Sequence, residues 1–182
     1  MDLDERFGQC RPAARPVAEV EQHIQPRSLQ RLADVAAVLK TYLECAGDLA
    51  IPAVFHETAP ILWLVDEDGA IRIAMEEVVL RDTGALRYIL PRNGPPMEAH
   101  HVRLGHPALL DPVEPGMVKE ARIGGELFYD PVRYSPVSWV ISNNSGRYGK
   151  REGITRSHIN NVRDVFASYD IQVRPFFIEW RG

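Results

Sequence analysis

The sequence predicts an α+β fold, a mainly antiparallel sheet with an N-terminal helix and a second helix before the C-terminal edge strand. Predicted strands cluster in the middle of the chain and do not alternate with helices, which favours α+β over a doubly wound sheet. Two other segments carry apolar residues at intervals of three and four, the spacing of an amphipathic helix.

The composition is that of a globular protein. The chain has 182 residues, of which 45% are hydrophobic and 25% charged, and this balance excludes collagen-like, disulfide-scaffold and wholly disordered proteins. Residues 1–25 mix proline, charged and small residues without a sustained period, so we expect a flexible N-terminal tail there. Residues 26–182 are expected to form a single α+β domain.

The first predicted helix covers residues 28–46, with Ser28 as its N-cap and Gly47 at its end. After Pro60, residues 61–65 and 70–79 predict two strands joined by an acidic turn that contains Asp68-Gly69, which together indicate a hairpin. Residues 85–90 predict a third strand, and a long loop with several prolines follows over residues 91–116.

Two more strands are predicted over residues 119–129 and 137–142, with Ser135-Pro136 in the connection between them. The second helix begins at Thr155 or Ser157 and ends at Tyr169. The apolar pattern of residues 171–180 indicates a last strand, placed at an edge because Pro175 has no N–H for a strand partner.

Residues 143–153 are the most informative segment for function. Between residues 143 and 163 there are five basic residues and one acidic residue, a net charge of +4, so the rest of a chain with net charge −4 carries −8. Backbone N–H groups of a glycine-containing loop, together with a helix start, can bind an anion such as phosphate. A solvated basic turn is the alternative. The candidate ligand-binding residues are Asn143, Asn144, Ser145, Arg147, Tyr148, Lys150 and Arg151.

His106 and Glu126 are the candidate acid and base groups. Three imidazoles lie within seven residues, at His100, His101 and His106, and imidazole titrates near neutral pH. His106 is preferred, because adjacent histidines point apart in an extended segment. Glu126 follows Gly124-Gly125, and glycines within a strand mark a bulge or a close approach of backbone, next to which Glu126 would face a cleft. An ordinary solvent-facing glutamate is the alternative.

Partners and compartment are only loosely constrained. A net charge of −4 argues against binding duplex nucleic acid, and no apolar run is long enough to cross a membrane. Two cysteines, Cys10 and Cys45, define no disulfide framework, and no metal site or cofactor is predicted. The acidic N-terminus does not match a signal peptide, so we expect synthesis in the cytoplasm; export by a route without a cleavable signal stays open.

Residues 104–173 also resemble a domain of bacterial toxin-like and effector proteins that occurs in plant IQ-motif calmodulin-binding proteins. LGHPALL stands at the place of that family's HSSF segment, IGGEL is similar to its A-G-E strand, and WVISNNSGRYG is similar to its I-S-N-x-S-G-H-Y-x-P segment. Arg147 replaces the family's histidine, and the serines after His106 are absent.

The resemblance implies an effector-like role without an established reaction. Combined with the basic loop, it leads us to expect an enzymatic domain that binds a nucleotide or dinucleotide and catalyses transfer or hydrolysis. The alternative is a non-enzymatic interaction, regulatory or immunity module that docks a partner protein through the same basic segment.

Overall fold

The computed structural model describes residues 2–94, 96–114, 116–131 and 137–181. Most of its strands belong to two β-sheets. The main sheet has the order β11–β10–β9–β3–β4–β2, and a smaller sheet has the order β6–β5–β7. All neighbouring strands are antiparallel except β10 and β11. The helices and these antiparallel strands confirm the predicted α+β class.

The main sheet consists of β2 (Gln30–Arg31), β3 (Ile61–Val65), β4 (Ile71–Met75), β9 (Ile123–Tyr129), β10 (Trp139–Ser142) and β11 (Arg174–Phe176). The smaller sheet consists of β5 (Glu77–Leu80), β6 (Leu86–Ile89) and β7 (His101–Leu104). A short pair joins β1 (Arg11–Pro12) to β8 (Glu120–Ala121). The helices are α1 (Leu3–Phe7), α2 (Glu19–His23), α3 (Leu32–Asp48), α4 (Ala50–Thr58), the 3₁₀ helix η1 (His106–Leu109) and α5 (Arg156–Ser168).

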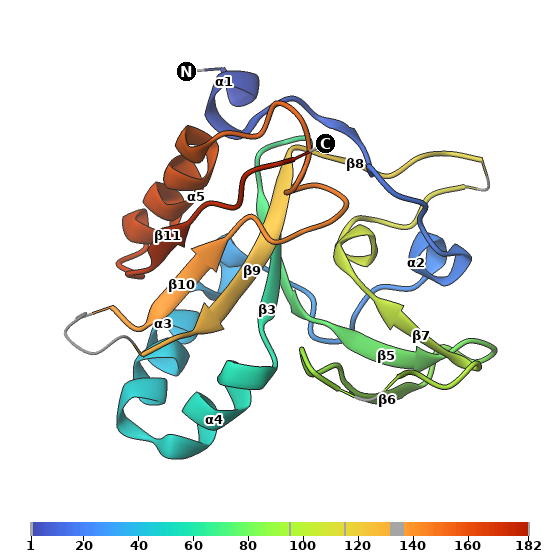
Figure 1. Cartoon of the computed structure of the whole chain (residues 1–182), viewed down its shortest axis with the longest axis horizontal. Helices are drawn as coiled ribbons and strands as arrows, with labels where there is room; N and C mark the ends of the chain where they lie inside the picture. The colour runs from blue at the N-terminus through green and yellow to red at the C-terminus, as the bar shows by residue number, and fades with distance from the viewer. Residues whose placement is uncertain (1, 95, 115, 132–136, 182) are drawn as a thin grey trace.

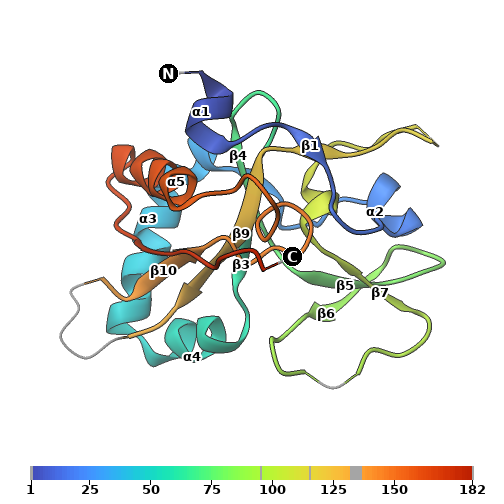
Figure 2. The same ribbon diagram turned by 45° about the horizontal axis from the view of Figure 1, so that its top comes forward.

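Both faces of the main sheet are covered, as Figures 1 and 2 show. On one face, Trp63 and Ile141 pack against buried residues of α3 and α5 such as Leu39 and Phe166. On the other face, Leu62 and Leu64 pack against residues that include Leu109 of η1. The fully buried sequence of β3 follows from this arrangement, since a strand covered on both sides needs no polar alternation.

Most predicted elements are present with shifted ends. β3 and β4 form the predicted hairpin, closed by a turn in which Gly69 has a φ of +83°. The single strand predicted over residues 70–79 was wrong, because the chain breaks at Glu76 into β4 and β5, which belong to different sheets. The second predicted helix corresponds to α5, and β11 is at the predicted sheet edge. Ser135-Pro136 lies outside the described residues.

Three sequence expectations were wrong in detail. Ser28 does not cap α3; its Oγ instead donates to Glu77 and accepts from the Met75 N–H, and β2 precedes the helix. The 91–116 loop contains β7 and η1, and the short α4 was not predicted. At Ser28, contacts with residues distant in the sequence outweigh the local signal.

Residues 2–25, part of the segment 1–25 for which the sequence predicts a flexible tail, form short elements that contact the rest of the fold. α1 packs beside α5, and Phe7 is 1% exposed within the core. β1 pairs with β8, and the buried carboxylate of Glu21 in α2 accepts a hydrogen bond from the Gly105 N–H. Short elements without a strong period are therefore ordered here by tertiary contacts.

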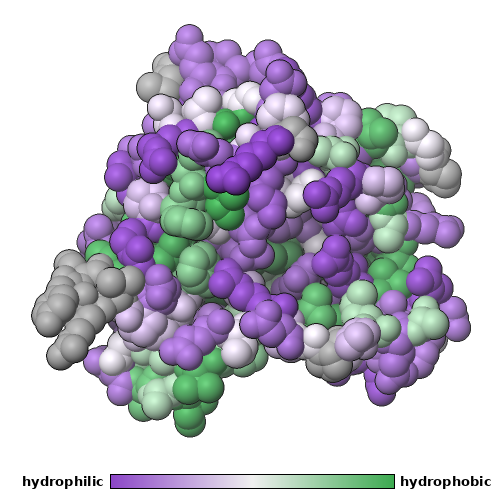
Figure 3. Space-filling view, in the orientation of Figure 1, coloured by the Kyte–Doolittle hydropathy of each residue, from purple (hydrophilic) through white to green (hydrophobic). Residues whose placement is uncertain are grey.

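Among the residues that the structure describes, no helix combines the length and the apolar character needed to cross a bilayer. The surface does carry one apolar patch. Figure 3 shows hydrophobic residues gathered over α4, where Ile51 is 82% exposed and Val54 is 63% exposed.

Candidate functional site

A polar cavity of about 380 Å³ brings together most of the predicted site residues. It is bordered by the main sheet, by the small sheet through Arg103 of β7, and by the start of η1. Six predicted residues line it: His106, Glu126, Asn144, Ser145, Arg147 and Lys150. The sequence predicted these residues from segments that are far apart in the chain, and they meet at this one place.

His106 is held at the first position of η1, with its side chain against β9. Its Nε2 lies 2.9 Å from the carbonyl oxygen of Gly125. Because a carbonyl only accepts hydrogen bonds, Nε2 carries the proton and Nδ1 keeps a free lone pair. Burial lowers the pKa of His106 to about 4. The imidazole is therefore neutral at physiological pH, and its Nδ1 can accept a hydrogen bond.

Glu126 reaches the cavity from β9, directly after the two glycines. Its carboxylate forms an ion pair with Arg92 at 2.6 Å, and the Arg92 guanidinium also lies over the ring of Phe128. A Cβ on Gly125 would overlap the backbone of Ser142, so the close approach of backbone predicted for the glycines is present. This approach brings the loop after β10 next to Glu126.

The loop after β10 is closed by hydrogen bonds within itself. Ser145 Oγ accepts from the backbone N–H groups of Arg147 and Tyr148, and Ser145 O accepts from those of Gly149 and Lys150. The start of α5 does not line the cavity. The backbone N–H groups of residues 147–150 are therefore not free for the expected anion pocket, and the loop offers side chains to the cavity. One of these is Lys150, whose Nζ lies 2.8 Å from Asn144 Oδ1.

Arg147 lines the cavity with its charge already compensated. Its Nη2 lies 3.0 Å from Oε2 of Glu21, whose side chain is 1% exposed. Glu21 also accepts the backbone N–H of Gly105, the residue before His106. This buried carboxylate from α2 thus positions both Arg147 and the start of η1.

Three predicted ligand-binding residues have structural roles instead. Asn143 bonds the backbone of Gly149 and Ile178, and the Tyr148 hydroxyl donates to Lys119 O. The terminal nitrogens of Arg151 donate to the carbonyls of residues 9, 11, 12, 121 and 122. None of the three lines the cavity. Their polar groups are needed inside the fold because their side chains are buried.

Sequence reasoning missed Arg15, Glu76 and Arg103, which also line the cavity. Arg15 lies in the segment interpreted as a tail, and Arg103 in the segment interpreted as a loop. Glu76 lies between β4 and β5, where one run of chain passes from the main sheet to the smaller sheet. The two successive glutamates at positions 76 and 77, which interrupt an apolar run, are a signal that could have found it.

Cationic side chains without a carboxylate partner dominate the cavity. Arg15, Arg103 and Lys150 form no ion pair with any described residue, whereas Arg147 and Arg92 do. Glu76 is the lining carboxylate that lacks a partner among the described residues. The unpaired groups therefore leave an excess of positive charge, which suits an anionic ligand.

Two neighbouring cavities extend this site. One of about 470 Å³ shares Glu76, Arg103, Glu126 and Asn144 with it. The other, of about 650 Å³, shares Arg15, Gly146 and Lys150. We call the three together the cleft. Glu76 and Glu126 thus lie toward the first extension, and the unpaired Lys150 and Arg15 lie toward the second, which Glu179 and Arg181 also line.

Glu98, His100 and His101 are the described residues best suited to hold a metal ion. Their ligand atoms lie within 4.8 Å of one another, and one carboxylate with two imidazoles suits zinc. The expectation that the adjacent histidines point apart was wrong: their ring centroids are 4.4 Å apart. His100 precedes β7 in a turn, where the His101 N–H donates to Glu98 O, so strand alternation does not apply.

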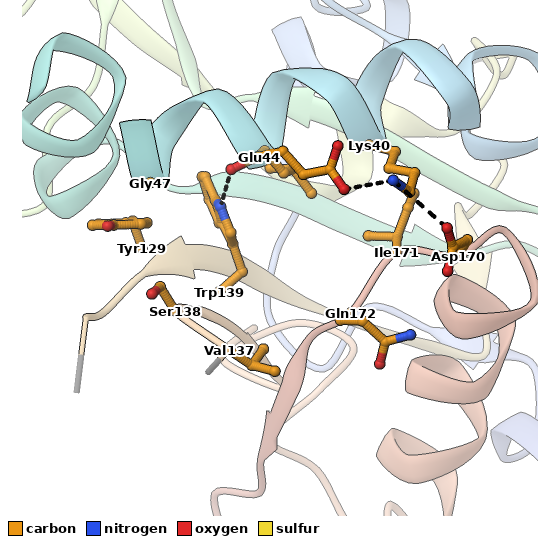
Figure 4. A pocket seen from close by; sticks show the side chains of 11 residues that line it. Lys40, Glu44, Gly47, Tyr129, Val137, Ser138, Trp139, Asp170, Ile171 and Gln172 are labelled. Atoms are coloured by element: carbon orange, nitrogen blue, oxygen red, sulfur yellow. Dashed lines mark hydrogen bonds and ion pairs between the residues drawn. The ribbon is translucent and has the colours of Figure 1, made fainter. Parts of the chain in front are cut away.

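A separate cavity of about 290 Å³ lies between α3 and β10 (Figure 4). Lys40 forms ion pairs there with Glu44 and Asp170, and the Trp139 Nε1–H donates to Leu43 O at 2.9 Å. The polar groups that Figure 4 joins by dashed lines are hydrogen-bonded or ion-paired with one another. This arrangement favours a structural role for that cavity.

No family model, curated protein sequence or solved structure matches the chain.

Proposed function

We propose that the cleft binds a phosphate-bearing ligand of the nucleotide or dinucleotide type. The observation that carries this proposal is the set of three cations, Arg15, Arg103 and Lys150, that line one cavity without a carboxylate partner among the described residues. Charged side chains left unpaired in a concave site favour a ligand of opposite charge, and arginine and lysine both bind phosphate groups in proteins.

The side chains around these cations fit an enzymatic site. His106 offers a neutral imidazole nitrogen, and Glu126, held by Arg92, offers a carboxylate. Because its pKa is about 4, His106 suits a hydrogen-bonding role better than that of a general base at neutral pH. Transfer or hydrolysis at a nucleotide, as part of a toxin or effector-type activity, is the reaction that we propose.

Calorimetry with pyrophosphate and ADP tests ligand binding. We expect Lys150→Met to weaken the binding of both by about tenfold, since one charge-assisted hydrogen bond contributes about 1.5 kcal/mol or more. Arg163→Met is the matched control, because it removes one exposed cation outside the cavity. Absence of binding by the wild type, or equal losses in both variants, contradicts the proposal.

An interaction, regulatory or immunity module is the second candidate. Of the basic segment expected to dock a partner, Arg147 is ion-paired and Arg151 is buried. The exposed apolar patch on α4, which contains Ile51 and Val54, supports a protein partner better. Growth of bacteria expressing each variant separates the two candidates. Loss of growth inhibition with Lys150→Met alone supports an enzyme, and loss with Ile51→Asp alone supports an interaction module.

A further inference from the structure

Glu76 occupies a special place in the cleft. β4 ends at Met75 and β5 begins at Glu77, so Glu76 is the residue at which the chain leaves the main sheet for the smaller one. The break brings its side chain to the wall of both the 380 Å³ cavity and the 470 Å³ cavity. The backbone is held there by the hydrogen bond from the Leu90 N–H to Glu76 O, at 2.8 Å.

The carboxyl group of Glu76 has no hydrogen bond or ion pair with the described residues, unlike the carboxyl groups of Glu77 and Glu126. Glu77 accepts three hydrogen bonds from Arg27 and Ser28, and Glu126 pairs with Arg92. Burial and the nearby carboxylates raise the pKa of Glu76, against the attraction of Arg103. A half-buried carboxyl without a donor costs folding free energy. Such costs are typical of functional sites.

The chemistry of Glu76 excludes the phosphate group as its partner, because two anions repel each other. A carboxylate binds groups that donate, and two neighbouring hydroxyls can each donate to one of its two oxygens. The unpaired cations Arg15 and Lys150 lie toward the other extension of the cleft. A ligand whose hydroxyls face Glu76 and whose phosphates face Arg15 and Lys150 matches the positions of these three side chains.

We propose that Glu76 binds the ribose hydroxyls of a nucleotide whose phosphates contact Lys150 and Arg15. This inference rests on the proposed function, because it needs a phosphate-bearing ligand in the cleft. It adds the class of ligand: a ribonucleotide, and not a simple phosphate. It also assigns a binding role to Glu76.

Calorimetry with pyrophosphate, ADP and 2′,3′-dideoxy-ADP tests this assignment. The wild type is expected to bind ADP about tenfold more tightly than dideoxy-ADP, since hydrogen bonds between hydroxyls and a carboxylate are charge-assisted. Glu76→Gln keeps the shape but removes the charge, so it should abolish most of this preference. The affinity for pyrophosphate should stay the same or increase, because a negative charge is lost.

The control is Glu57→Gln, which removes an exposed carboxylate of α4 away from the cleft and should leave all three affinities unchanged. Equal binding of ADP and dideoxy-ADP by the wild type, or an unchanged preference in Glu76→Gln, overturns the role of Glu76. In that case binding of pyrophosphate still supports the phosphate site. If the wild type binds none of the three ligands, both proposals fail. Circular dichroism of each variant establishes that the fold is retained.

Discussion

At the scale of single residues, internal hydrogen bonds decide which predicted side chains are available to a ligand. His106 and Arg151 illustrate the difference. Both are buried, but His106 satisfies one ring nitrogen and leaves the other free, whereas Arg151 uses its terminal nitrogens on five backbone carbonyls. A residue type predicts the chemistry that a side chain can perform; its neighbours decide whether that chemistry is already used inside the fold.

His106 makes the stability of the fold depend on pH. Folding lowers its pKa from 6.5 to about 4, so the unfolded chain binds the proton more tightly and stability falls as the pH drops from 6.5 to 4. Between pH 7.5 and pH 5 we expect His106 to account for a loss of about 2 kcal/mol.

Urea unfolding of the wild type and of His106→Gln at these two pH values measures this effect. Glutamine retains an N–H for Gly125 O, and burial lowers the pKa of His56 and His158 in the same direction. Those two residues remain in the variant, so the difference between the two proteins isolates His106. An identical pH dependence in both would show that His106 titrates normally.

At the scale of elements, glycines and strand breaks shape the cleft. β9 carries Gly124 and Gly125 opposite β3, so the loop after β10 can lie directly on its backbone. The run of chain from β4 to β5 changes sheets at Glu76. Both features bring polar side chains to the end of apolar strands, where a cavity can form.

Two Gly→Ala variants, one in the loop that contacts β9 and one in α3, are expected to change the free energy of unfolding in opposite directions. A Cβ on Gly149 would overlap the carbonyl oxygens of Asn143 and Gly124, and we expect Gly149→Ala to lower the free energy of unfolding by at least about 2 kcal/mol. A Cβ on Gly47, within α3, would meet no atom within 4 Å, so Gly47→Ala should raise it by about 0.5 to 1 kcal/mol. Urea denaturation measures both changes, and a tolerated alanine at position 149 would refute the close contact.

At the scale of the whole molecule, the N-terminal segment completes both the core and the cleft. α1 contributes Phe7 to the core, and α2 contributes Glu21, which holds Arg147 and the start of η1. These contacts join residues more than 80 positions apart in the sequence. The cleft therefore depends on the correct docking of a segment whose local pattern is weak.

The pair of Glu21 and Arg147 predicts a coupled effect on stability. Glu21→Gln retains the acceptor for the Gly105 N–H but leaves the Arg147 charge, on a side chain 17% exposed, without compensation. We expect a loss of about 3 kcal/mol, as when one partner of a buried ion pair is removed. Adding Arg147→Met should recover part of this loss.

Thermal or urea unfolding of the four proteins in this double-mutant cycle gives the coupling free energy. We expect a value of about 1 kcal/mol or more. Additive losses in the two single variants would mean that the ion pair contributes nothing to the stability of the fold.

Local patterns predicted the elements that are long and periodic. The α5 helix and the β3–β4 hairpin follow from apolar spacing and from an Asp-Gly turn. Among the candidate site residues, His106, Glu126 and Lys150 line the cleft as expected, although their function remains a prediction. Asn143, Tyr148 and Arg151 do not, because sequence patterns carry no information on whether a polar side chain has an internal partner.

The sequence by itself determined the α+β class, the polar character of the segment after β10 and the presence of glycines where backbones approach closely. Only the tertiary structure decided how residues 2–25 pack on the rest of the fold, the pairing of Arg147 with Glu21 and the exposure of Glu76 to the cleft. The physical reason is the range of the interactions. Periodicity and turn chemistry act between near neighbours, whereas burial and charge compensation depend on residues that only folding brings together.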